Sequence, residues 1–195
     1  KINYNKNGKI LIVLNALGYR EQYWDKDYFF TKNFKRKIFF LSSFKKKFLQ
    51  DNIILRLGKS IDKFRFNEKK KIKDKFPKLI IDSNESIYKT YTHSRLIIHF
   101  YLSTTFLETV SQNIPSIMLL DKHQYIYNKK TLLIFKILKK NQILFEDSKK
   151  MKVFIEKNFS NLEKWWYSKT VQEALDKFRE YYCRTGNIKQ IVDII

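Results

Sequence analysis

The chain has 195 residues, of which 44% are hydrophobic and 30% are charged, and its formal net charge is +21. This length and apolar content are sufficient for one domain with a well-packed core. No run of about 18 apolar residues occurs, which argues against a membrane-spanning helix, and the polar residues 1–9 do not resemble a signal peptide. The single cysteine, Cys183, excludes an intramolecular disulfide, and the three histidines lack the spacing of a metal site. We therefore expect a cytoplasmic protein without a metal or other cofactor.

Lysine supplies most of the positive charge. The chain has 33 Lys and seven Arg, and residues 1–80 alone carry 22 basic and seven acidic side chains. A protein that reads phosphates or bases would be expected to use more Arg, because its guanidinium forms bidentate hydrogen bonds. A basic nucleic-acid-binding module that uses residues 31–75 remains an alternative, although the helical spacing of the aromatics there favours core burial. The lysines of residues 35–47 predict a solvated helix face, and a peripheral membrane contact is open to it.

The first half of the chain alternates short apolar runs with longer amphipathic or polar segments. Residues 10–14 are apolar on both faces, which is typical of a buried parallel strand. Apolar residues then recur at three- and four-residue steps over 28–50, a pattern that predicts one amphipathic helix. Residues 53–57 and 79–82 predict two further strands, and the polar segment 59–75 between them predicts partly irregular structure.

The second half continues this alternation and ends in helices. Residues 86–92 predict one or two helical turns, 96–100 the clearest strand of the chain, and 105–112 a helix. A strand over 115–120 follows, and helices are expected over 131–140, 148–159 and 171–182. This order predicts an α/β fold, a Rossmann-like doubly wound parallel sheet with a helical C-terminal tail. We expect a single domain over 1–195, with sheet-forming units in 1–128 and a mainly helical part in 129–195.

A hydroxyl-rich turn joins the clearest strand to the helix that follows it. Ser103, Thr104 and Thr105 stand where the carboxyl edge of the sheet is expected, and helix N-terminal amides at such an edge bind anions such as a diphosphate. No glycine-rich phosphate loop occurs, so dinucleotide redox enzymes and P-loop kinases lack their motif. The alternative is purely structural: Thr105 and Glu108 have the spacing of a capping box, in which each side chain bonds a backbone amide of the first turn.

Other candidate residues each have a structural alternative. His99, at the end of its strand, can face a ligand or be packed and hydrogen-bonded. The segment 15–20, with Asn15, Gly18, Tyr19 and Arg20, can line a cleft or form an ordinary loop. Trp165 and Trp166 can form a sugar-stacking platform, but core packing is the more usual role of such bulky aromatics.

Three segments carry a resemblance to a known family. They are SRLIIHFYLSTTFLETVSQNIPSIMLL (94–120), IILRLGKSIDKFRFNE (53–68) and WWYSKTVQEALDKFREYY (165–182). Together they resemble the C-terminal, donor-binding domain of bacterial surface-polysaccharide transferases, which are similar to glycosyltransferases of the two-Rossmann-domain (GT-B) type. Pro115 matches the proline that precedes the next strand in that family. The Thr residues of the turn depart from the Gly of many relatives.

The resemblance implies a nucleotide-diphosphate sugar as the donor and a glycan or lipid-linked acceptor. It places the diphosphate at Ser103, Thr104 and Thr105 and the ribose hydroxyls at Glu108. Arg56 and Lys59 become candidate phosphate contacts, and His99 a further donor-binding candidate.

The same resemblance implies that 195 residues hold only one of the two domains. The catalytic base of this class usually comes from an N-terminal Rossmann-like domain, so we expect that domain as a missing partner and the present chain to be inactive alone. A start at Lys rather than Met agrees with a fragment. We expect a cytoplasmic enzyme, for which a location at the inner face of the cytoplasmic membrane is left open. A non-catalytic remnant of a truncated gene remains the alternative.

Overall fold

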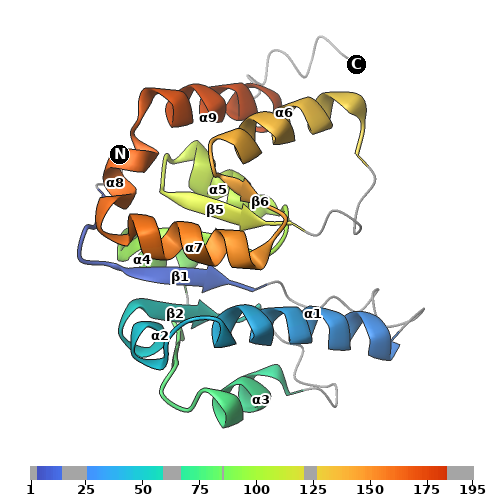
Figure 1. The fold of residues 1–195 in the computed structure, drawn as a ribbon, viewed down its shortest axis with the longest axis vertical. Helices are drawn as coiled ribbons and strands as arrows, with labels where there is room; N and C mark the ends of the chain where they lie inside the picture. Colours follow the sequence, from blue (N-terminus) through green and yellow to red (C-terminus); the bar gives the residue numbers. More distant parts are fainter. Residues whose placement is uncertain (1–3, 15–25, 59–66, 85, 121–126, 184–195) are drawn as a thin grey trace.

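The computed structural model describes residues 4–14, 26–58, 67–84, 86–120 and 127–183. These residues form a parallel sheet in the order β3-β2-β1-β4-β5-β6 (Figure 1). Its strands are β1 (Lys9–Val13), β2 (Ile53–Arg56), β3 (Ile80–Ile81), β4 (Ser94–His99), β5 (Ser116–Leu119) and β6 (Leu144–Phe145). The chain runs from β1 outward to β3, returns to lay β4 beside β1, and then runs outward to β6. This is the strand order of a doubly wound fold, so the predicted fold class is confirmed.

Helices cover both faces of the sheet because the central strands are apolar on both faces. Ile10 and Ile12 of β1 belong to one core cluster, and Leu11 and Val13 to another. The helices that contribute to the first cluster are α1 (Lys26–Ser42), α2 (Lys46–Asn52), α3 (Glu68–Lys75), α7 (Ser148–Asn158) and α8 (Leu162–Trp166). The helices of the opposite face are α4 (Ile87–Thr92), α5 (Thr104–Ser111), α6 (Lys129–Lys140) and α9 (Lys169–Tyr182). A 3-10 turn, η2 (Phe159–Asn161), joins α7 to α8.

The single helix predicted over residues 28–50 is wrong, because the chain forms α1 and α2 instead. α1 ends at Ser42, and Lys45 has extended backbone angles (φ −59°, ψ 139°) immediately before α2 begins. The apolar spacing nevertheless continues across the break, since Phe40, Phe44 and Phe48 pack ring against ring on the same face of the sheet. Periodicity alone therefore could not show the break.

The segment predicted as partly irregular contains a helix, and the sheet continues into the C-terminal part of the chain. α3 occupies Glu68–Lys75, and Asn67 caps it by accepting a hydrogen bond from the Lys70 amide. β6 pairs with β5 beyond residue 128, so the region 129–195 contributes a strand as well as helices. A two-residue strand is too short to give a visible pattern in a sequence.

Trp166 is a core residue and Trp165 is partly buried against both large clusters, as the packing alternative predicts. Trp166 is fully buried and its indole N–H donates to Asn113, in the turn between α5 and β5. Arg179 of α9 donates to Asn113 Oδ1 in the same turn and to the Val110 carbonyl at the end of α5. The segment that matches the family motif around Pro115 is thus fixed from α8 and α9.

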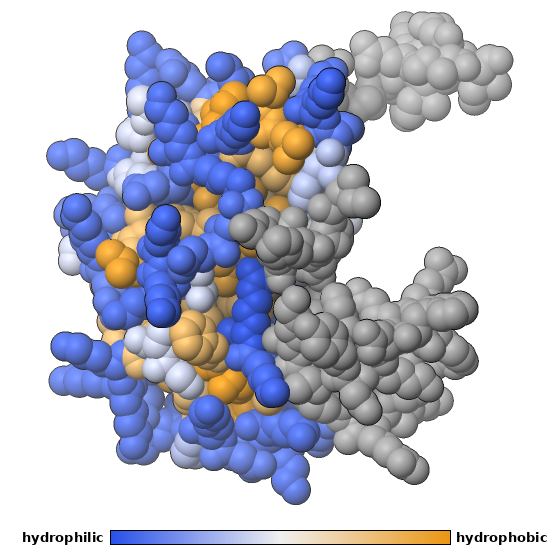
Figure 2. Space-filling model, turned by 45° about the vertical axis from the view of Figure 1, so that its right-hand side comes forward, coloured by the Kyte–Doolittle hydropathy of each residue, from blue (hydrophilic) through white to orange (hydrophobic). Residues whose placement is uncertain are grey.

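The outer surface of the helices is strongly polar. The face in Figure 2 is mostly hydrophilic, with small apolar patches between the charged side chains. Among the described residues, no helix combines the length and the apolar character needed to cross a bilayer.

Candidate functional site

The point where the strand order reverses lies between β1 and β4. Both strands end at the same edge of the sheet, and the chain leaves β1 and β4 in opposite directions. Ligands of doubly wound sheets bind outside the carboxyl ends of the strands at such a point. His99 is the last residue of β4, and α5 begins at Thr104 above the same edge. The structure therefore brings the predicted turn to the predicted position in the fold.

The first turn of α5 presents backbone amides at this edge. Ser103 is the N-cap, with an extended backbone (φ −144°, ψ 172°), and its carbonyl accepts from the amides of Phe106 and Leu107 at 3.1 and 3.2 Å. The amides of Thr104 and Thr105 find no acceptor among the residues that the structure describes. They lie at the positive end of the helix dipole, an arrangement that attracts an anion.

The predicted capping box at Thr105 and Glu108 is wrong. The helix starts two residues earlier than that pattern requires, so Thr105 is its second residue and Ser103 is the cap, without a side-chain cap bond. The Thr105 hydroxyl lies 2.7 Å from Ser103 Oγ and 3.3 Å from His99 Nδ1. These contacts hold the Thr105 side chain against the sheet and away from the helix amides.

His99 is fully buried and hydrogen-bonded at both ring nitrogens. Thr109 Oγ1 lies 3.2 Å from His99 Nε2 and 3.0 Å from the Phe106 carbonyl. Because Thr109 must donate to that carbonyl, it accepts from Nε2–H, and Nδ1 is left to accept from the Thr105 hydroxyl. Burial lowers the pKa of His99 to about 3, which keeps the ring neutral at physiological pH. This imidazole is a packed, positioning group that does not face the edge of the sheet.

The same chain of hydrogen bonds determines which hydroxyls can reach an anion. If Thr105 donates to His99, it accepts from Ser103 Oγ, so the hydrogens of both hydroxyls point into the protein. Thr104, the remaining hydroxyl of the turn, is exposed. Burial raises the pKa of Tyr101 beside this turn, and the Ser103 and Thr105 hydroxyls act in the opposite direction. An anion here would meet two amides and the Thr104 hydroxyl.

Glu108 lies one turn further along α5. Within the described part of the chain its carboxylate makes no hydrogen bond or ion pair. Its charge acts on Tyr91 of α4: burial raises the pKa of Tyr91, and the carboxylate of Glu108 raises it further. The Tyr91 hydroxyl is itself buried, with no hydrogen-bond partner among the described residues.

Arg56 ends β2 at the same edge, but its side chain is engaged. Its Nη1 donates to Asp82 Oδ2 at 2.5 Å and to the Asn84 carbonyl at 2.9 Å. Asp82 also accepts from the Thr90 hydroxyl at 2.8 Å. Burial would raise the pKa of Asp82, but the hydrogen bonds from Arg56, Thr90 and the Asn84 amide outweigh it, so the pKa is lowered. Asp82 thus takes up much of the charge that Arg56 could offer to a phosphate.

The remaining candidates belong to segments 15–25 and 59–66. Lys59 and the segment with Asn15, Gly18, Tyr19 and Arg20 lie outside the described residues.

Sequence reasoning missed Asp82, Tyr91 and Thr109. For Thr109 a signal existed, since it lies four residues after Thr105 and so on the same helix face. Asp82 and Tyr91 are distant in sequence from the residues that they affect.

Comparisons with known proteins place the chain in a family. A comparison with curated proteins finds no match. Among solved structures, the catalytic domain of cholesterol-alpha-glucosyltransferase from Helicobacter pylori is similar, with 17% identity, a TM-score of 0.40, and coverage of 89% of this chain and 97% of that chain. The fold assignment rests on the strand order and not on this likeness. A model of the LIC12162 family transferases matches residues 1–192, so the chain belongs to this transferase family, as the resemblance of its sequence implies.

Proposed function

We propose that this chain is the nucleotide-sugar-binding domain of a glycosyltransferase-like enzyme of bacterial surface-carbohydrate biosynthesis. Membership of a transferase family supports a group-transfer reaction. The observation that carries the proposal is the start of α5 at the reversal point of the sheet. Two amides that meet no acceptor within the described part of the chain stand there, one turn from Glu108. The acceptor would be a glycan or a lipid-linked sugar.

The donor diphosphate would bind at the amides of Thr104 and Thr105, with the Thr104 hydroxyl as a further donor. Three residues of helix rise by about 4.5 Å, so the carboxylate of Glu108 lies within reach of the ribose of a nucleotide held there. An ionised carboxylate accepts from two hydroxyls at once, and charge-assisted bonds are about twice as strong as neutral ones.

The chemical role of this arrangement would be to stabilise the leaving diphosphate. Negative charge develops on the diphosphate as the bond to the sugar breaks, and fixed amides and a helix dipole stabilise that charge without reorganising. Arg56 would add to this effect only by sharing its guanidinium between Asp82 and the phosphate.

A thermal-shift measurement with nucleotides tests the proposal. We expect UDP, GDP or CDP to raise the melting temperature, because a ligand at 100 times its Kd stabilises a fold by about 2.7 kcal/mol. The corresponding nucleosides and inorganic pyrophosphate are the controls, and each should raise it less than the full nucleotide. If none of the three nucleotides at millimolar concentration moves the transition of a folded sample, donor binding is excluded.

Glu108→Gln separates ribose binding from a structural role. The amide keeps the length of the side chain but offers one acceptor oxygen, so nucleotide affinity should fall by about 1–3 kcal/mol. The fold should be intact, since the carboxylate bonds no described residue. Glu163→Gln, at an exposed site on α8, is the matched control. Equal nucleotide affinity of wild type and Glu108→Gln, measured by calorimetry, would remove Glu108 from the site.

A further inference from the structure

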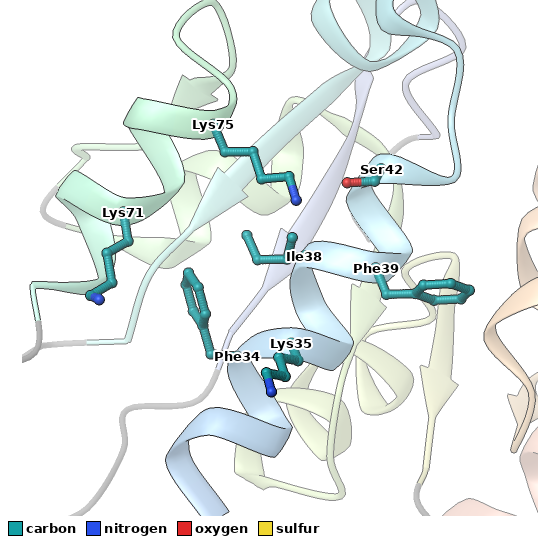
Figure 3. A pocket seen from close by; sticks show the side chains of 7 residues that line it. All are labelled: Phe34, Lys35, Ile38, Phe39, Ser42, Lys71 and Lys75. Atoms are coloured by element: carbon teal, nitrogen blue, oxygen red, sulfur yellow. The ribbon is translucent and has the colours of Figure 1, made fainter. Parts of the chain in front are cut away.

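A groove of about 580 Å³ lies between α1 and α3, on the opposite face of the sheet from α5. Its lining residues come from both helices: Phe34, Lys35, Ile38, Phe39, Ser42, Lys71 and Lys75. In Figure 3 the side chains of Phe34 and Ile38 lie in the middle, between the lysines of α3 and Lys35 of α1. The ring of Phe39 points away from α3, and it is 52% exposed. The groove thus combines an apolar floor with a rim of ammonium groups.

The sequence of α3 explains why the groove is open and basic. The helix contains five lysines and buries one residue, Ile72, so most of its surface faces solvent. Its first residue, Glu68, accepts from Lys37 of α1 at 2.9 Å, with 11% and 3% of the two side chains exposed. This ion pair ties α3 to α1 and neutralises the acidic residue at the start of α3.

A second cavity of about 360 Å³ adjoins the groove and extends its apolar character. It shares Ser42 and Lys75 with the groove. Its other lining residues are mostly apolar side chains with two further lysines: Leu41, Phe44, Lys46, Leu49, Gln50, Phe76, Pro77, Lys78 and Leu79. The second cavity thus offers further apolar side chains to a hydrocarbon chain bound in the groove.

The charge around both cavities is of one sign. Their described lining residues include five lysines, Lys35, Lys46, Lys71, Lys75 and Lys78, and no acidic residue. An isolated phosphate or a polyanion needs the lysines but not the apolar floor, and a neutral hydrocarbon needs the floor but not the lysines. A ligand that is anionic at one end and hydrocarbon at the other is complementary to both.

We propose that the α1–α3 groove docks the chain on a membrane by binding an anionic phospholipid. The lysines of the rim contact the lipid phosphates, and the floor formed by Phe34 and Ile38, with Phe39 beside it, receives acyl-chain methylenes. Lysine suits this role because its ammonium acts as a point charge on a long apolar stem. A nucleic acid would instead favour arginine and stacking platforms, whereas no arginine is among the lining residues described.

Binding of the full chain to vesicles, without nucleotide, tests the docking surface independently of donor binding. Vesicles of phosphatidylcholine alone are compared with vesicles that also contain phosphatidylglycerol, and we expect binding to the anionic vesicles only. Each lysine near an anionic surface contributes roughly five-fold to partitioning. The triple variant Lys35→Gln, Lys71→Gln, Lys75→Gln should therefore bind about 100-fold more weakly.

Two matched controls distinguish binding by the groove from an effect of net charge alone and from nonspecific adsorption through exposed apolar residues. A control variant loses the same charge at exposed sites on α6 and α7, through Lys136→Gln, Lys140→Gln and Lys157→Gln. Its affinity for anionic vesicles should fall only a few-fold. Phe39→Ala should weaken vesicle binding several-fold, while Leu133→Ala, at a residue of α6 that is 60% exposed, should not.

Three results would overturn the proposal. The first is equal binding to neutral and anionic vesicles, and the second is an equal loss in the two triple variants. The third is a groove variant that loses affinity for a single-stranded oligonucleotide while its vesicle binding is unchanged, which would assign the groove to nucleic acid. Circular dichroism of every variant shows that the fold is kept.

Discussion

The imidazole of His99 is fully buried and lies between the hydroxyls of Thr105 and Thr109. Its pKa is lowered from 6.5 to about 3 by burial, so the unfolded chain binds a proton at a higher pH than the folded chain does. Stability from this residue is fully present above pH 6.5 and is lost as the pH falls from there towards 3. We expect the free energy of unfolding to decrease over that window by up to about 1.4 kcal/mol per pH unit.

Urea unfolding of the wild type and of His99→Gln between pH 7 and pH 4 measures this contribution. The variant cannot titrate at this position, so its stability should fall less steeply with decreasing pH, although it starts lower because the glutamine is a poorer partner for the two threonines. His93→Gln, at an exposed site, is the matched control. The lowered pKa of Asp82 adds a loss of stability with falling pH as well, but only near and below its ordinary pKa of 3.8. Parallel curves for wild type and His99→Gln would show that the buried ring is not the cause.

The site residues show where sequence reasoning stops. The turn 103–105 could be placed at the carboxyl edge of the sheet, because the strand before it and the helix after it each show a local apolar pattern. The partners of its side chains could not be predicted. Thr105 turns to His99, six residues away, and Arg56 to Asp82, 26 residues away. Such pairs depend on how the strands align, and a capping pattern in the sequence does not exclude a better partner across the fold.

At the scale of elements, the contact of β1 with β4 depends on a glycine just before β1. A Cβ on Gly8 would lie 2.5 Å from the His93 carbonyl oxygen and 2.8 Å from the Arg95 nitrogen, both backbone atoms that cannot move aside cheaply. Gly8→Ala should therefore destabilise the fold by about 1–3 kcal/mol, the range for overpacking. Urea unfolding measures the change, and Asn7→Ala at the neighbouring exposed position is the control. Equal stability of the two variants would mean that β1 shifts freely against β4.

The elements themselves were predictable in proportion to how much of each one is buried. β1, β4 and β5 are buried along most of their length and give unbroken apolar runs. α9 also matches its prediction, because four of its residues face the core at helical spacing. α3, which buries only Ile72, and β6, which has two residues, leave too weak a pattern. The break between α1 and α2 is hidden because both helices pack on the same cluster.

On the scale of the whole molecule, the two proposed sites use helices from opposite faces of one sheet. The donor site is at the carboxyl edge, at the start of α5, and the groove lies between α1 and α3. α5 belongs to the face of the second core cluster, and α1 with α3 to the face of the first. Because the groove and the α5 edge share no residue, membrane docking through α1 and α3 would leave the α5 edge open to a donor. For a lipid-linked acceptor, such docking would also confine the enzyme to the surface where the acceptor is found.

From the net charge of +21 we predict how the chain binds nucleic acid. Lysines spread over the surface contact phosphates without reading bases, so any affinity should be independent of sequence and carried by counterion release. If about five phosphates of a single strand are neutralised, the affinity should fall roughly 100-fold between about 50 and 200 mM salt. Fluorescence anisotropy with several unrelated oligonucleotides across a salt series measures both properties. The groove and control lysine variants should weaken this binding equally, in contrast to their unequal effects on vesicles. A tight complex with one defined sequence at physiological salt would instead identify base recognition, and the nucleic-acid function would then take precedence over the transferase one.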